Sequence, residues 1–123
     1  MIGPKTKKFR SKKYTDWVKS LPSCISGEQA HDPHHIKGHG QGGTVRASDL
    51  FTMPLTRWEH TYFHDTGPES WEAEFKTSQW IHVINTIEQA LDEGVIELSF
   101  VIEEINNQVV SPADLELLER YFY

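Results

Sequence analysis

Apolar residues recur with a helical period near the start of the chain. Between positions 11 and 20, Tyr14, Trp17 and Val18 fall on one face of a helix whose other positions are mostly polar. Ser11 is a residue type that caps helix N-termini, and Pro22 prevents the helix from continuing. The pattern therefore predicts a helix over residues 11–20.

Two short apolar segments flank a polar, glycine-rich stretch further along. Residues 30–36 and 50–55 have the length and composition of strands, and residues 37–48 form a loop too long for a tight turn. Residues 57–64 follow with helical spacing, because Trp58 and Tyr62 are i,i+4 neighbours. The chain is thus expected to form a hairpin that leads into a helix.

The C-terminal half is predicted to be mainly helical. Pro68 suits the first turn of a helix, and Gly94 suits the position just after a helix end. The stretch from 68 to 93 fits either two helices or one long helix. Residues 96–105 alternate weakly and predict an edge strand or a loop, whereas Ser111 and Pro112 predict the start of a terminal helix. The expected fold class is α+β.

Length and composition predict a small globular protein. Its 123 residues, 37% of them hydrophobic, suit a single core. We expect a flexible basic arm at 1–10, the main domain at 11–96 and an acidic C-terminal extension at 97–123. The single cysteine, Cys24, excludes an internal disulfide. No apolar run has the length of a membrane helix or follows the basic start as in a secretory signal, so we expect a cytoplasmic protein with no membrane partner.

Charge is distributed very unevenly. The net charge is −6, yet residues 1–57 hold ten Lys/Arg against four acids, and residues 58–123 hold two against fourteen. A basic segment beside an acidic body is typical of proteins that face a polyanion. An ordinary solvated tail and helix face would look the same. The candidate nucleic-acid contacts are Lys7, Lys8, Arg10, Lys12, Lys13, Lys37 and Arg46.

Six of the seven histidines fall between positions 31 and 64. His34 and His35 end the first predicted strand, and His60 and His64 have the i,i+4 spacing that puts two side chains on one helix face. Imidazole is the commonest protein ligand for divalent metals and changes charge near neutral pH. We therefore expect His34, His60 and His64 to hold one metal ion while His35 activates a water.

This arrangement resembles the HNH, or ββα-metal, nuclease superfamily over roughly residues 22–66. A narrower resemblance, from about 11 to 96, is to a phage and prophage HNH family that includes the RecA-dependent recombination-enhancement nuclease. The residues that carry it are Pro33-His34-His35-Ile36, Gly38-His39-Gly40-Gln41-Gly42-Gly43, Asp49-Leu50-Phe51 and Pro54-Leu55. The resemblance implies a small ββα-metal hairpin-helix core with an N-terminal helix and additional C-terminal helices.

The resemblance also implies roles for individual residues. His34 corresponds to a metal ligand and His35 to the general base, with His60 and His64 as the remaining ligands. Asp49 stands where the superfamily usually has an asparagine that ties the loop down near the base. Nitrogen ligands favour Zn²⁺ or Ni²⁺. Mg²⁺ or Mn²⁺ completed by phosphate oxygens is an alternative.

The chain departs from many of these relatives at a second, structural metal site. Two CxxC-like cysteine pairs hold a structural zinc in those proteins. The matching positions here read Ser23-Cys24-Ile25-Ser26 and Thr56-Arg57-Trp58-Glu59, so no structural zinc is expected. Its stabilisation must then come from elsewhere, and packing of Trp58 and Tyr62 under the hairpin is one candidate.

Three functions fit these patterns. The first is a metal-dependent endonuclease that hydrolyses DNA, double- or single-stranded, in phage or prophage recombination or processing. The second is a catalytically silent nucleic-acid-binding module on the same scaffold. The third is contact with a recombinase, or homodimer formation, through the acidic C-terminal half, although packing on the protein's own core is the favoured explanation of its apolar face. That face comprises Leu115, Leu118, Tyr121 and Phe122.

Overall fold

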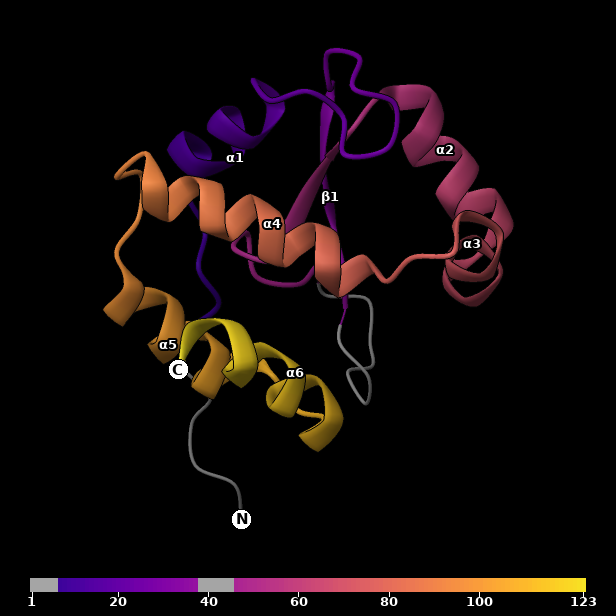
Figure 1. Ribbon diagram of the computed structural model, residues 1–123. Helices are drawn as coiled ribbons and strands as arrows, with labels where there is room; N and C mark the ends of the chain where they lie inside the picture. The colour runs from indigo at the N-terminus through magenta and orange to yellow at the C-terminus, as the bar shows by residue number, and fades with distance from the viewer. Residues whose placement is uncertain (1–6, 38–45) are drawn as a thin grey trace.

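The computed structural model describes residues 7–37 and 46–123, and it is an α+β structure, as expected (Figure 1). The glycine-rich part of the family resemblance, residues 38–43, lies outside the described residues. In chain order the elements are α1 (Lys12–Lys19), β1 (Asp32–His35), β2 (Thr52–Leu55), α2 (Arg57–Thr66), α3 (Pro68–Phe75), α4 (Gln79–Asp92), α5 (Leu98–Gln108) and α6 (Pro112–Phe122).

The hairpin lies at the centre of the molecule. Strands β1 and β2 pair antiparallel, with His34 opposite Met53 and His35 opposite Thr52. Helix α1 packs against both strands, α4 packs against β2, and α2 contacts both strands from the other side (Figure 1). Helices cover the strand, so every residue of β2 is buried, and the strand shows no clear alternation of apolar and polar residues.

Helix boundaries follow local chemistry. The Ser11 side chain accepts a hydrogen bond from the Tyr14 backbone N–H and caps α1 as predicted. Thr56 and Glu59 form a reciprocal capping box at the start of α2. Gly67, with φ of 90°, separates α2 from α3 and allows the sharp change of direction there.

The stretch from 68 to 93 forms two helices rather than one. Lys76 adopts a left-handed backbone conformation at the end of α3, and the Ser78 side chain caps α4. The two helices together bury Trp71, Trp80 and Ile84, and burial of each such side chain stabilises the fold by roughly 1.5–3 kcal/mol.

The prediction of an edge strand or loop at 96–105 was wrong, because this region forms most of α5. The weak alternation of apolar and polar residues suggested a strand, but the residues that are buried in the core are spaced four positions apart, as in a helix. Val101 and Ile105, four positions apart, are fully buried, whereas Leu98 is 46% exposed. Contact with the rest of the core therefore selects the helical period.

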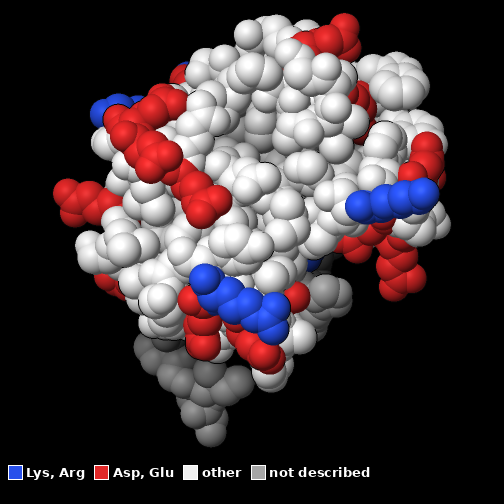
Figure 2. All heavy atoms as spheres, in the orientation of Figure 1, with Lys and Arg blue, Asp and Glu red and all other residues white. Residues whose placement is uncertain are grey.

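Both ends of the described chain pack on the same core. Phe9 contacts the rings of Tyr14 and Phe100, and Leu118 and Phe122 of α6 are buried in the common cluster. Two of the four residues of the apolar face considered for self-association are thus buried by the protein itself, whereas Tyr121 is 44% exposed. Figure 2 shows many acidic and far fewer basic side chains on the side that carries α4, α5 and α6. Within the described ranges, no helix is long and apolar enough to cross a membrane.

Candidate metal centre

His34 is the least accessible of the predicted site residues. It lies in β1 with 1% of its surface exposed, and neither ring nitrogen has a hydrogen-bond partner among the described residues. Burial, with smaller contributions from the nearby His60 and His64, lowers the pKa of His34 to about 3. The ring is therefore neutral at physiological pH, which is the form that binds a metal ion.

His60 and His64 of α2 complete what we call the histidine cluster, His34, His60 and His64. The Nε2 atoms of His60 and His64 lie 3.0 Å apart. The ring centroids of His60 and His64 lie 4.8 and 5.4 Å from the ring centroid of His34. One nitrogen from each ring lies within 4.8 Å of the others. Nitrogens bound to one tetrahedral zinc at about 2.0–2.1 Å are roughly 3.3 Å apart. Small side-chain adjustments would let this donor set hold one ion.

Asp32 supports the cluster, although the sequence interpretation assigned it no role. Its carboxylate lies 3.2 Å from Nδ1 of His60 and 3.3 Å from the Arg57 guanidinium. A carboxylate on the outer nitrogen of an imidazole fixes the tautomer and orientation in which the other nitrogen faces a metal. Asp32 and His34 lie two apart on a strand and so share a face, which is the signal that could have identified it.

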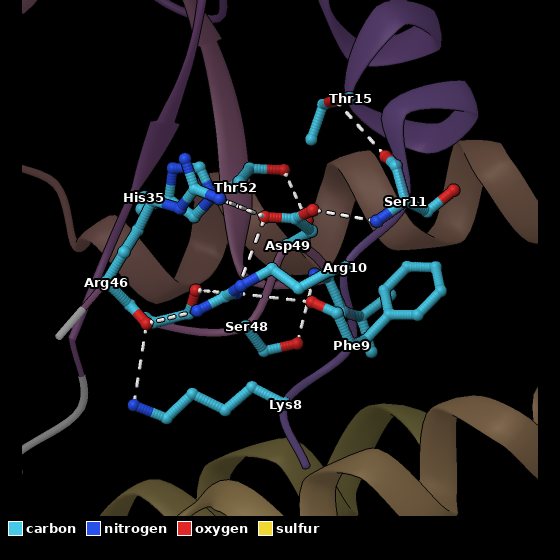
Figure 3. Close-up of polar contacts among 12 residues, drawn as sticks. Lys8, Phe9, Arg10, Ser11, Thr15, His35, Arg46, Ser48, Asp49 and Thr52 are labelled. Atoms are coloured by element: carbon cyan, nitrogen blue, oxygen red, sulfur yellow. Dashed lines mark hydrogen bonds and ion pairs between the residues drawn. The ribbon is translucent and has the colours of Figure 1, made fainter.

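His35 forms a pair with Asp49 (Figure 3). The His35 Nε2 atom lies 2.8 Å from Oδ1 of Asp49, a carboxylate that is only 4% exposed. An ionised carboxylate only accepts, so we assign the proton to Nε2 and leave Nδ1 as the basic nitrogen. Burial lowers the pKa of His35, and the Asp49 carboxylate partly opposes this effect. The resemblance predicted that Asp49 ties the loop near the base; the structure adds a direct contact with the base itself.

Three of the predicted basic contacts gather beside this pair. Arg10 and Arg46 lie 3.5 and 3.9 Å from Asp49, and Lys8 reaches the Arg46 carbonyl (Figure 3). The Arg10 guanidinium also donates to the carbonyls of Arg46 and Ala47.

The other predicted basic contacts are more scattered. Lys12 forms an ion pair with Asp16 on α1, Lys7 and Lys13 are exposed, and Lys37 follows β1 at the rim of a hollow formed with the start of α3.

The positions that match the cysteine pairs form a hydrogen-bonded group, which we call the polar clasp, Ser23, Thr56 and Glu59. Glu59 Oε1 accepts hydrogen bonds from the Ser23 hydroxyl at 2.6 Å and the Thr56 backbone N–H at 2.7 Å. The clasp connects α2 to the turn before β1. The expectation that Trp58 packs under the hairpin was wrong, because Trp58 is 71% exposed and stacks on Tyr62.

Fold and site together define a small α+β domain with a candidate metal centre of three histidines beside a His–Asp pair. The chain belongs to the DUF968 family of proteins of unknown function, whose model matches residues 1–94. It is 42% identical over 94 residues to the uncharacterized protein YdfU of Escherichia coli strain K12. That match covers 76% of this chain and 26% of YdfU, so the chain spans about a quarter of that relative's length. No solved structure matches the chain.

Proposed function

We propose that this protein is a metal-dependent endonuclease of the HNH, or ββα-metal, type that hydrolyses DNA phosphodiester bonds. The observation that carries the proposal is His34, a buried imidazole whose nitrogens have no partner among the described residues and which faces His60 and His64. The adjacent strand position holds a second histidine paired with a carboxylate. This combination of a metal ligand set and a poised base is what phosphodiester hydrolysis requires.

The chain's own residues have distinct roles in this proposal. His35 accepts the proton of the attacking water at Nδ1, and Asp49 holds Nε2–H and stabilises the charged ring that results. His34, His60 and His64 would hold one divalent ion. A bound ion supplies charge stabilisation on the phosphate and on the leaving 3′ oxygen.

Charge beside the pair supports a polyanionic substrate. The guanidinium groups of Arg10 and Arg46 lie next to Asp49, and the two side chains are 37% and 59% exposed, so they can contact both protein and phosphate. Phosphate contacts position DNA without reading its sequence, so we expect little sequence preference from these residues. A part in phage or prophage recombination or processing is the biological role that the family resemblance suggests.

A plasmid-nicking assay tests the proposal. We expect nicking with at least one of Mg²⁺, Mn²⁺, Zn²⁺ and Ni²⁺, and its loss in EDTA. His35→Ala should reduce nicking by about 10²–10⁴-fold because the water loses its base. It should leave metal affinity, measured by calorimetry, unchanged. His82→Ala in α4 is the matched control and should nick normally, since His82 bonds Thr77 away from the site.

Two results would contradict this assignment. Undiminished nicking by His35→Ala would exclude His35 as the base. A protein that shifts DNA but nicks it with none of the four ions would instead support the catalytically silent nucleic-acid-binding module.

A further inference from the structure

A buried carboxylate of α5 contacts the segments that hold the His35–Asp49 pair. Glu104 is 4% exposed. Its Oε2 accepts a hydrogen bond from the Phe9 backbone N–H at 2.9 Å and another from the Ser48 hydroxyl at 2.5 Å. Burying a carboxylate is costly unless such bonds compensate, so this placement needs a reason beyond packing.

The two donors come from the two segments that surround Asp49. The Phe9 carbonyl accepts a hydrogen bond from the Asp49 backbone N–H at 3.0 Å, and the Ser11 N–H donates to Asp49 Oδ2 at 2.8 Å (Figure 3). Ser48 directly precedes Asp49, and its hydroxyl also accepts the Leu50 N–H. Glu104 therefore joins residues 9–11 to residues 48–50 through a single oxygen atom.

We infer that Glu104 is a positioning residue for the His35–Asp49 pair. Its carboxylate holds the two segments at a fixed separation, so that Asp49 keeps one oxygen on the Ser11 N–H and the other on His35 Nε2. Contact between the Phe9 and Phe100 rings, 4.7 Å between centroids, aligns the same segment against α5. The catalytic consequence rests on the proposed nuclease function, whereas the positioning itself does not.

Glu104 belongs to a part of the chain that the family model does not match, because that match covers residues 1–94. An apolar side chain could fill the same space, but it would leave the Phe9 N–H and the Ser48 hydroxyl without this acceptor. The chemistry of the carboxylate, rather than its volume, is what connects α5 to the site.

Three variants of the full chain test the inference. Glu104→Ala removes the acceptor, Glu104→Gln keeps one carbonyl oxygen in its place, and Glu103→Ala changes an exposed neighbour on the same helix. All measurements on these variants are made well below the melting temperature of the least stable variant. Ser48→Ala removes one of the two bonds to Glu104, together with the acceptor of the Leu50 N–H, and replaces Glu104→Ala if that variant does not fold.

The first readout needs no enzymatic activity. In Glu104→Ala we expect amide hydrogen exchange at Asp49 and Ser11 to accelerate at least about tenfold, because local opening becomes easier. Long-range ¹⁵N NMR of His35 should change from a single Nε2–H tautomer to a mixture. Glu104→Gln should stay within about threefold of wild type because an acceptor remains, and Glu103→Ala should be unchanged.

The second readout is the nicking reaction. We expect Glu104→Ala to lower kcat about tenfold with KM and metal affinity unchanged, because a displaced base weakens the chemical step more than binding. A lower melting temperature with wild-type exchange at Asp49 and Ser11, an unchanged His35 tautomer and an unchanged kcat would show a merely structural role and overturn the inference. If wild-type protein does not nick, the proposed function fails, and exchange and the tautomer alone decide the positioning.

Discussion

Helix α2 carries two polar clusters that connect it to the preceding chain, and they differ in how completely they satisfy their own atoms. In the polar clasp, the buried Glu59 carboxylate accepts from the Ser23 hydroxyl and from the Thr56 backbone. In the histidine cluster, neither nitrogen of the buried His34 has a hydrogen-bond partner among the described residues. Leaving a buried polar atom unsatisfied typically costs about 1–3 kcal/mol.

This difference in hydrogen bonding suggests that the polar clasp stabilises the fold, whereas the histidine cluster is suited to bind a ligand. The clasp is complete without any ligand and holds the turn before β1 against α2. The histidine cluster brings one nitrogen of each of three imidazole rings within 4.8 Å of the others, and the buried His34 ring is neutral. A metal ion can stabilise such an arrangement by binding the deprotonated nitrogens. The two clusters should therefore respond in opposite ways to mutation and to added metal.

The largest expected effect is on metal binding. His34→Ala should weaken the affinity for a metal ion by more than about 100-fold. Losing a residue that only orients a metal ligand typically weakens it by about 10–100-fold, and losing a ligand itself should cost more. Calorimetry with Zn²⁺ and Ni²⁺ measures it, with His82→Ala as the control. Equal affinity in the two variants would show that His34 is not a ligand.

Lowering the pH should destabilise the metal-free protein through His34. An unfolded histidine binds a proton near pH 6.5, whereas the folded pKa is about 3. Stability from the neutral ring is therefore complete above pH 6.5 and falls as the pH drops towards 3, by up to about 1.4 kcal/mol per pH unit. Denaturant unfolding between pH 7 and pH 4 measures the slope. His34→Leu should flatten it, and an unchanged slope would argue against a neutral buried ring.

Disrupting the clasp should affect folding alone. Glu59→Ala removes the acceptor of two buried hydrogen bonds and is expected to cost about 2–3 kcal/mol. The melting temperature should fall while metal affinity, measured in the folded range, stays at the wild-type value. Glu59→Gln, which keeps an acceptor, should lose less. A large loss of metal affinity in Glu59→Ala would mean that the clusters are coupled.

Replacing Asp32 tests whether its carboxylate orients His60 for metal binding. Asp32→Ala frees Nδ1 of His60 and should lower metal affinity by about 10–100-fold. Glu28→Ala, an exposed acid in the same segment, is the charge-matched control. Identical metal-titration curves for the two variants would show that Asp32 does not contribute to metal binding.

The smallest effect is expected at Trp58. Because its ring is largely exposed and gains only the stacking contact with Tyr62, Trp58→Ala should cost less than about 1 kcal/mol. Thermal unfolding measures it. A loss as large as that of Glu59→Ala would restore the aromatic pair as the replacement for a structural zinc.

Local sequence signals predicted most of the elements. Ser11, Pro68 and Ser111 marked helix starts that the structure confirms. Histidine spacing, together with the family resemblance, brought His34, His60 and His64 into one group, and the structure places them within reach of one ion. These signals succeed because they depend on neighbours within one turn or one strand.

The failures involve residues whose partners lie far away in sequence. Asp32 and His60 are separated by 28 positions, Ser23 and Glu59 by 36, and Ser48 and Glu104 by 56. The helical form of residues 98–108 likewise depends on the core that Val101 and Ile105 enter.

The amino-acid sequence by itself indicated the candidate metal ligands, because His34 lies on a predicted strand and His60 and His64 lie four positions apart on a predicted helix. Only the tertiary structure decided how those groups are held. It left His34 buried with both nitrogens unsatisfied, completed the clasp at Glu59 without a metal and connected Asp49 to α5. The physical reason is that burial and hydrogen-bond satisfaction are properties of surfaces that meet only on folding.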